Sequence, residues 1–162
     1  MVEKIISGFQ DGADIAGIDF ARKHNIATGG HIPFGYRTLS GNKLEYAEFG
    51  AIEHPSYEYP PRTEENVKNS DVTVRFAGDL FSAGEKCTLK FIKRHKKEHF
   101  DVDFSCLSRI NIQEVLKAFD DFLLKNNVKI LNVAGNSPKT YPKIYKCTMR
   151  FLDLWWEQYA NH

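Results

Sequence analysis

The sequence predicts an α/β fold in which helices cover both faces of a mostly parallel sheet, in a single domain over residues 1–162. Three observations support this prediction. Short apolar and β-branched runs alternate with segments of helical periodicity along the chain. Hydrophobic residues make up 42% and charged residues 27%, as in ordinary globular proteins. With 162 residues the chain is long enough to bury a core and fits one domain.

The first half of the chain contains two predicted strands and one predicted helix. Residues 4–7 form a buried strand, and residues 13–24 form a helix whose small-residue face suits packing on a sheet. The glycine-rich residues 25–45 predict a long loop. Residues 46–53 predict a short strand, and residues 54–61, which are rich in proline, a rigid connector.

The middle of the chain continues the alternation of helix and strand. A short polar helix is predicted over residues 62–69, and the β-branched residues 72–77 predict a strand. A loop over residues 78–84 leads into a helix over residues 85–96, whose apolar side chains share one face. Alternating apolar residues predict the next strand over residues 99–104.

The last third adds two helices around one strand. Asn111 with Glu114 three residues later predicts a capping box at the start of an amphipathic helix. Residues 128–133 predict a strand and residues 142–159 the final helix. The aromatic side chains around Trp155 cannot all face one core from a single helix. They predict either a homo-oligomer contact through this helix or burial under loops, and both readings stay open.

Charge and cysteine content exclude several classes of protein. The net charge of +1 gives no electrostatic case for nucleic acid or for an acidic membrane surface. Cys87, Cys106 and Cys147 are odd in number and lack a CxxC spacing, which argues against a disulfide framework or a zinc ribbon and fits a reducing compartment. No run approaches the ~20 apolar residues that span a bilayer, and none resembles a signal peptide. We therefore expect a cytoplasmic protein with no membrane partner.

Glycine-bearing loops follow the predicted strands at residues 7, 77 and 133, and ligands of parallel α/β sheets bind beyond such strand ends. The turn over residues 7–14 joins a strand to a helix, so its backbone N–H groups and the helix dipole predict an anion site. A plain βα turn also favours glycine. The loops at residues 82–88 and 134–138 are equally compatible with ligand binding and with simple connection.

Arg62, Thr63 and Asn66 lie near the start of a short helix, where a guanidinium, a hydroxyl and an amide can hold a phosphate or a carboxylate. The alternative is a capped surface helix with solvated charges. His95 and His99 are four residues apart, but they lie in a lysine-rich stretch that fits a solvated charge run better than a metal site. No metal ligand and no catalytic residue is assigned.

These motifs together resemble the family named "putative molybdenum-cofactor carrier", a circularly permuted, Rossmann-like group related to the cytokinin-activating phosphoribohydrolases. The resemblance extends over nearly the whole chain and implies a Rossmann-like three-layer sandwich. The residues that carry it are Ile5–Gly8, Gly12–Asp14, Gly29–Gly30 with Pro33 and Gly35, Tyr59–Val67 with Ser70–Asp71, and Leu131–Gly135.

The resemblance implies a site for a phosphorylated, nucleotide-like or pterin-like small molecule over the carboxyl edge of the sheet. The cofactor is not identified; the molybdenum cofactor and a nucleotide are the candidates. The ligand contacts that it implies are Gly8, Gln10, Gly12, Ala13, Asp14, Gly30, Arg62, Thr63, Asn66, Gly84, Thr88, Gly135 and Asn136.

The departures from the family pattern cluster at this site. Phe9 and Asp11 stand where the first turn usually has Gly and Thr, and Ala83 replaces a Gly. Phe34 and Ser137 stand where the family usually has Lys and Arg. Loss of two cations weakens phosphate binding by several kcal/mol, because charge-assisted hydrogen bonds contribute about 1.5–3 kcal/mol each. Arg37 or Lys139 is a candidate to compensate.

Three functions follow from these observations, and the sequence favours the first. In it, the chain binds a phosphorylated small molecule, with Arg62 supplying charge and the amides of Gly12 and Ala13 an anion nest. The second is a phosphoribohydrolase or related N-glycosidase, for which the candidate acids are Asp14, Glu64, Asp71 and Glu85. The third is a degenerate family member that serves as a protein-interaction module through its carboxyl-terminal helix.

Overall fold

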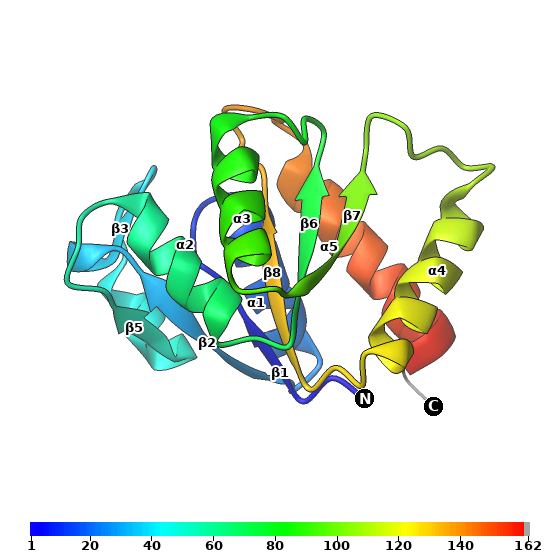
Figure 1. Cartoon of the computed structure of the whole chain (residues 1–162), viewed down its shortest axis with the longest axis horizontal. Helices are drawn as coiled ribbons and strands as arrows, with labels where there is room; N and C mark the ends of the chain where they lie inside the picture. The colour runs from blue at the N-terminus through cyan, green and yellow to red at the C-terminus, as the bar shows by residue number, and fades with distance from the viewer. Residues whose placement is uncertain (161–162) are drawn as a thin grey trace.

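The chain forms a three-layer α/β sandwich around a six-stranded parallel sheet (Figure 1). The structure, a computed structural model, describes residues 1–160. The order of strands across the sheet is β5-β2-β1-β8-β6-β7, and every pairing in it is parallel. The strands are β1 (Lys4–Ile6), β2 (Ala27–Ile32), β5 (Ala51–Glu53), β6 (Val72–Ala77), β7 (Glu98–Asp103) and β8 (Ile130–Gly135). The predicted fold class is confirmed.

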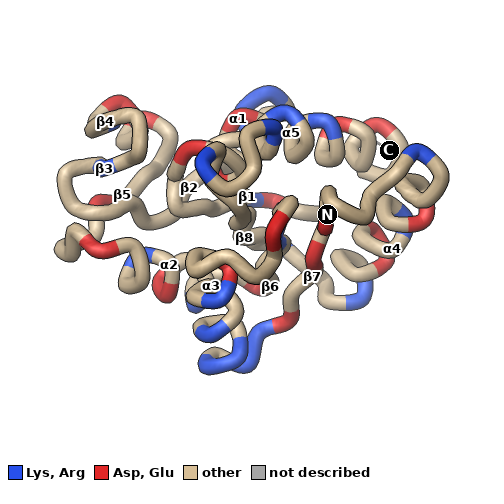
Figure 2. The backbone as a smooth tube through the Cα atoms, turned by 90° about the horizontal axis from the view of Figure 1, so that it is seen from above, with Lys and Arg blue, Asp and Glu red and all other residues tan. Residues whose placement is uncertain are grey.

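Helices cover both faces of the sheet. The view from above shows α1 and α5 on one side of the strands and α2 and α3 on the other (Figure 2). In that view Lys and Arg gather on the outer turns of α3, whereas charges of both signs alternate elsewhere. The helices are α1 (Ala13–Lys23), α2 (Tyr59–Lys68), α3 (Ala83–Arg94), α4 (Ile112–Lys125) and α5 (Ile144–Trp155). A small hairpin of β3 (Arg37–Thr38) and β4 (Gly41–Asn42) lies apart from the sheet.

The main core lies between the sheet and the layer of α1, α4 and α5. Phe20, Phe76, Phe119 and Phe151 are fully buried in it, and Phe119 meets Phe151 edge to face. Aromatic side chains each remove a large apolar surface from water, so this cluster is a main source of stability. A second core of Phe9, Ile18, Ile32 and Ala51 packs under β2 and β5.

The strand β2 corrects the predicted long loop over residues 25–45. Gly29 and Gly30 suggested a loop, because glycine usually weakens a strand. Gly30 has φ +124°, and a Cβ there would lie 2.1 Å from the carbonyl oxygen of Ser7. The glycine therefore allows β2 to approach the end of β1 closely, which is a packing reason for its presence in a strand.

Three other predictions need correction in detail. The strand expected over residues 46–53 is reduced to β5, because Leu44–Phe49 forms a 3₁₀-helix. The rigid connector ends early, since α2 already begins at Tyr59 with Pro at its first positions. The capping box is wrong: Asn111 is the N-cap of α4, but its Oδ1 accepts hydrogen bonds from the backbone N–H and hydroxyl of Ser108 instead.

The aromatic carboxyl-terminal segment packs inside the molecule. Trp155 is 3% exposed, and its indole N–H donates to Asp120 at 3.0 Å. A π-helical turn, Trp156–Ala160, continues α5, and the Trp156 ring packs at a tilt against His24, the C-cap of α1. Burial therefore accounts for these rings within one chain, and a homo-oligomer contact stays a prediction. No helix in residues 1–160 has the length and apolar content needed to cross a bilayer.

The burial of the Phe9 ring explains how a phenylalanine can stand where the family pattern has glycine. Its backbone has φ +56°, in the left-handed region where glycine is favoured and another residue costs roughly 1–2 kcal/mol. Its ring is fully buried in the second core beside Tyr46, with ring centroids 5.6 Å apart. Burying a phenylalanine contributes about 1.5–3 kcal/mol, which offsets the conformational cost. The turn therefore keeps its glycine-like shape without the glycine.

Candidate functional site

The loops at the carboxyl edge of the sheet enclose a cavity of about 470 Å³. Ligand pockets typically measure roughly 300–1,000 Å³, so the cavity suits a small molecule. Four segments that the sequence singled out meet here: the turn after β1, the first turns of α2 and α3, and the loop after β8. The hairpin tip adds Leu39 to the wall. The sequence-based convergence of loops on one site is therefore reproduced in the geometry.

Most of the predicted contact residues line this cavity. They are Gly8, Gln10, Asp14, Arg62, Thr63, Asn66, Gly84, Thr88, Gly135 and Asn136. Gly12, Ala13 and Gly30 do not line it. The backbone N–H of Ala13 donates to the carbonyl oxygen of Asn136 at 3.2 Å, so this amide is already engaged. A Cβ at Gly12 would lie 2.4 Å from the same oxygen, so this glycine serves the contact between the two loops.

Arg62 and Asp14 form a buried ion pair against the turn after β1. Their Nη1 and Oδ2 atoms are 3.4 Å apart, and their side chains are 13% and 8% exposed. Burial raises the pKa of Asp14, and the neighbouring Arg62 opposes that rise. Burial likewise lowers the pKa of Arg62, and Asp14 opposes the change. Arg62 therefore enters the cavity wall as half of a neutral pair instead of as a free cation.

Gly8 leaves the space that the guanidinium of Arg62 occupies. A Cβ at Gly8 would lie 1.6 Å from Arg62 Nη1 and 2.7 Å from Asp14 Oδ2. Gly8→Ala is therefore expected to separate the ion pair and to lower the free energy of unfolding by about 2–3 kcal/mol. Urea denaturation of both proteins measures this difference.

Gly84→Ala is the matched control for Gly8→Ala. Within residues 1–160, and apart from the chain neighbours and the backbone of the same helix, no atom lies within 4 Å of a Cβ at Gly84, and alanine favours the helix that begins there. Its free energy of unfolding is expected to stay within about 0.5 kcal/mol of the parent or to rise. If the two substitutions lower the free energy of unfolding by the same amount, Gly8 does not serve to make room for Arg62.

The amide side chains of the site mainly hold its loops in place. Asn66 accepts from the N–H of His31 at 2.7 Å and donates to its carbonyl at 3.1 Å, which ties α2 to β2. Asn136 accepts from the N–H groups of Gly78 and Asp79 at 2.9 and 3.0 Å. Gln10 donates to the carbonyl oxygens of Gly8 and Arg37. The polar groups of Asn66 and Asn136 are therefore largely committed to the protein.

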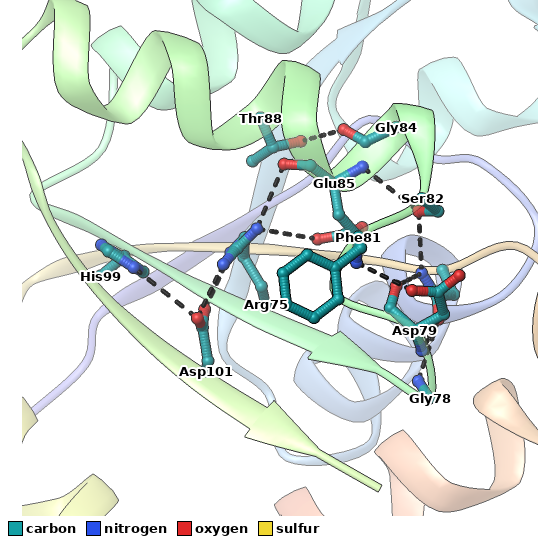
Figure 3. A network of polar contacts seen from close by, with 11 residues as sticks. Arg75, Gly78, Asp79, Phe81, Ser82, Gly84, Glu85, Thr88, His99 and Asp101 are labelled. Carbon is teal, nitrogen blue, oxygen red and sulfur yellow. Dashed lines mark hydrogen bonds and ion pairs between the residues drawn. The ribbon is translucent and has the colours of Figure 1, made fainter. Parts of the chain in front are cut away.

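Glu85 brings a second buried charge cluster to the cavity wall (Figure 3). Arg75 of β6 donates Nε and Nη2 to the carboxylate of Asp101 at 2.8 and 2.7 Å. Its Nη1 donates to the backbone carbonyl of Glu85 at 3.1 Å and lies 3.6 Å from Glu85 Oε2. Burial raises the pKa of Glu85 to about 8, although Arg75 opposes the rise. Burial therefore favours the protonated form of the Glu85 carboxyl.

Three side chains on the wall carry buried polar atoms without a hydrogen-bond partner in residues 1–160. These atoms are Gln10 Oε1, Arg62 Nε and Glu85 Oε2. An unpaired buried polar group costs roughly 1–3 kcal/mol, and proteins retain few of them. The side chains line the cavity, but these three atoms are themselves shielded from solvent, so each side chain would have to turn before a ligand or a water could pair with them.

The departures from the family pattern have individual structural outcomes. Asp11 accepts a hydrogen bond from the Ser40 hydroxyl at 2.9 Å, which holds the hairpin against the turn. Lys139 lies on the cavity wall two residues after Ser137. Its ammonium group can supply a positive charge in place of the arginine that the family usually has at position 137. The other candidate, Arg37, stacks its guanidinium over Tyr59 and does not line the cavity.

Some wall residues were not predicted as contacts. Leu39 comes from the hairpin, and no local pattern signals that this hairpin reaches the site. Tyr59 belongs to the motif that carries the family resemblance, and that motif was the available signal for it. The sequence predicts Glu85 as a candidate acid for an enzyme and not as a ligand contact.

Comparison with known proteins identifies the family. A sequence model of the circularly permutated YpsA SLOG family matches residues 5–156. A crystal structure named "Putative molybdenum carrier protein", from Syntrophus aciditrophicus SB, superposes with a TM-score of 0.88 at 33% identity. That match covers 95% of this chain and 94% of the other. No curated protein matches. Since the family model spans most of the chain, this protein belongs to the circularly permutated YpsA SLOG family.

Proposed function

We propose that the chain binds a phosphorylated nucleotide-like or pterin-like small molecule in the cavity at the carboxyl edge of its sheet. The observation that supports this most is the cavity of about 470 Å³, whose wall carries the polar side chains of Gln10, Thr63 and Lys139. A nucleobase or pterin ring has both hydrogen-bond donors and acceptors, so it can pair with polar side chains of this kind. The structural neighbour is named a molybdenum carrier protein, and a carrier role is consistent with a small-molecule ligand.

The positive groups of the wall favour an anionic end on such a ligand. Lys139 faces the cavity, and α3 begins there with Ala83 and Gly84. The first amides of a helix have no partner within the helix and carry the positive end of its dipole. In this proposal the amides at the start of α3, and not those of Gly12 and Ala13, bind the anionic end of the ligand. Arg62, paired with Asp14, orients the ligand more than it neutralises charge.

Thermal denaturation with a panel of ligands tests the proposal. Adenosine monophosphate (AMP), guanosine monophosphate and a phosphorylated pterin are compared with adenosine, which lacks the phosphate. At a concentration about 100-fold above its Kd, a ligand of this site is expected to raise Tm by roughly 5 °C or more. The shift should disappear in Arg62→Ala and persist in Arg94→Ala, which removes an exposed guanidinium of α3. No shift with any phosphorylated compound would contradict the proposal.

Two further readouts from the same samples separate the alternatives. Native mass spectrometry of the freshly purified protein reports any co-purified small molecule and the number of subunits. Chromatography of the AMP incubation for free adenine distinguishes a binding protein from an N-glycosidase. The buried carboxyls of Asp14 and Glu85 on one wall are the observation that makes the enzyme worth testing.

A further inference from the structure

Asn132 is a buried polar residue in the central strand β8, and the proposed function does not yet use it. The strand lies between β1 and β6, so both of its edges are paired. Asparagine is depleted in strands, and central parallel strands usually carry apolar side chains on both faces. Asn132 is only 3% exposed. Burial of an amide costs free energy unless its polar atoms have partners, so the surroundings of Asn132 are informative.

The side chain of Asn132 lies on the face of the sheet that carries the cavity. The next residue, Val133, belongs to the main core, and a Cβ at Gly17 of α1 would lie 2.7 Å from it. Side chains alternate along a strand, so Asn132 lies under the layer of α2 and α3 (Figure 2). Asn132 lines the cavity together with Thr63 of α2 and Thr88 of α3. The cavity therefore extends between these two helices down to the sheet, and Asn132 forms its floor.

The amide group of Asn132 is committed to the protein on one side only. Its Nδ2 donates to the hydroxyl of Thr73 on β6 at 3.1 Å. Its Oδ1 accepts no hydrogen bond in residues 1–160 and, unlike Oε1 of Gln10, is not shielded from solvent. Asn66 and Asn136 use both their oxygen and their nitrogen for contacts within the protein. Among the asparagines of the wall in the described residues, Asn132 is the one whose oxygen is open to a ligand.

We propose that Asn132 is a ligand-binding residue at the floor of the cavity, whose Oδ1 accepts a hydrogen bond from an N–H group on the ring of the ligand. This inference rests on the proposed function and narrows the ligand to one whose ring carries an N–H donor, as an amino-substituted purine or a pterin does. A carboxamide oxygen can only accept, and an ionised phosphate also offers acceptors. The oxygen of Asn132 therefore selects the ring and not the phosphate.

The depth of the cavity fits this orientation of the ligand. Asn132 precedes the last residue of β8, Gly135, by three positions, so the floor lies about 10 Å below the carboxyl edge of the sheet. Lys139 and the first residues of α3 lie on the cavity wall at that edge. A ligand with its ring at the floor and its phosphate at the edge spans this depth. The buried hydroxyl of Thr73 holds the amide, so the oxygen is oriented before the ligand enters.

Calorimetric titration with three purine nucleotides tests the role of Asn132. AMP and guanosine monophosphate carry N–H groups on the ring, whereas purine riboside 5′-monophosphate has the same bicyclic ring, sugar and phosphate without them. At least one of the first two is expected to bind the parent about tenfold more tightly than the third, because a buried acceptor is then paired. In Asn132→Ala this advantage should fall below about twofold. Asn69→Ala, which removes an exposed amide at the C-cap of α2, should keep it.

The outcomes separate this inference from the proposed function. Absence of binding by all three nucleotides and by a phosphorylated pterin would remove both. Equal affinities of the parent for the three nucleotides, or an advantage that survives in Asn132→Ala, would remove the role of Asn132 alone. If the pterin binds and the nucleotides do not, about tenfold weaker binding of the pterin to Asn132→Ala supports the inference, and unchanged binding overturns it.

An NMR measurement on the parent gives an answer even if Asn132→Ala fails to fold. The ¹⁵N resonance of the Asn132 side-chain amide is followed while the tightest-binding of the four compounds is added. A shift of this resonance, with the Asn69 amide unchanged as the reference, supports the inference. A resonance of Asn132 that stays in place at saturation overturns it.

Discussion

Glu85→Gln is expected to raise the free energy of unfolding at pH 8 by about 4 kcal/mol, while leaving it nearly unchanged at pH 4.5. In the folded chain the pKa of Glu85 is raised to about 8, whereas in the unfolded chain it returns to the ordinary value of 4.5. The stability of the parent is therefore fully present below pH 4.5 and is lost as the pH rises towards 8. Each unit of pKa difference corresponds to about 1.4 kcal/mol of stability. The glutamine variant has no proton to lose at this position, so its stability does not fall in this way as the pH rises. Urea denaturation at both pH values measures the difference.

Glu114→Gln provides the control for this experiment. Its carboxyl lies on the exposed face of α4, so the same change of chemical group is expected to alter stability by less than about 0.5 kcal/mol at either pH. If Glu85→Gln is instead less stable than the parent at pH 8, then Glu85 is ionised in the folded state. That result would make it a true partner of Arg75.

Arg62→Ala is expected to lower the free energy of unfolding by about 3 kcal/mol at pH 8. Removal of the guanidinium leaves Asp14 buried with its charge uncompensated, and breaking a buried ion pair typically costs about 3–5 kcal/mol. The loss should shrink at pH 5, because burial raises the pKa of Asp14 and the carboxyl can then take a proton. Combination with Asp14→Asn should recover part of the stability, since the charge that lacks a partner is removed as well.

Arg94→Ala is the matched control for Arg62→Ala. Its guanidinium pairs with Glu64 at 2.9 Å, but the Arg94 side chain is 50% exposed. Exposed pairs contribute about 0–1 kcal/mol, so this variant should unfold close to the parent. An Arg62→Ala variant that behaves like Arg94→Ala would show that the pair with Asp14 is not important for the fold.

The sequence predicts how strands and helices alternate along the chain, but it does not predict the strand β2. Runs such as Val72–Ala77 carry their own evidence, because β-branched residues mark a buried strand. Gly29 and Gly30 carry the opposite local signal. Their place in a strand depends on the backbone at Ser7, which is distant in sequence. A close approach between two backbones cannot be deduced from either segment alone.

The candidate site was predictable as a place but not as a set of charges. Glycine-bearing turns after parallel strands located the cavity. Arg62 looked like a free cation because its partner Asp14 is 48 positions away in sequence. Glu85 looked like an ordinary first-turn acid for the same reason, since the pairing of Arg75 with Asp101 is tertiary. Pairings of this kind decide whether a charged residue is available to a ligand.

The position of β8 has a consequence for how the molecule assembles. This strand is the last to be made, yet it lies between β1 and β6 in the centre of the sheet. Until residues 130–135 leave the ribosome, the growing chain holds two separate partial sheets with open edges. Contacts between such distant segments also slow folding. The edges of β1 and β6 therefore stay unpaired until β8 joins the two halves of the sheet.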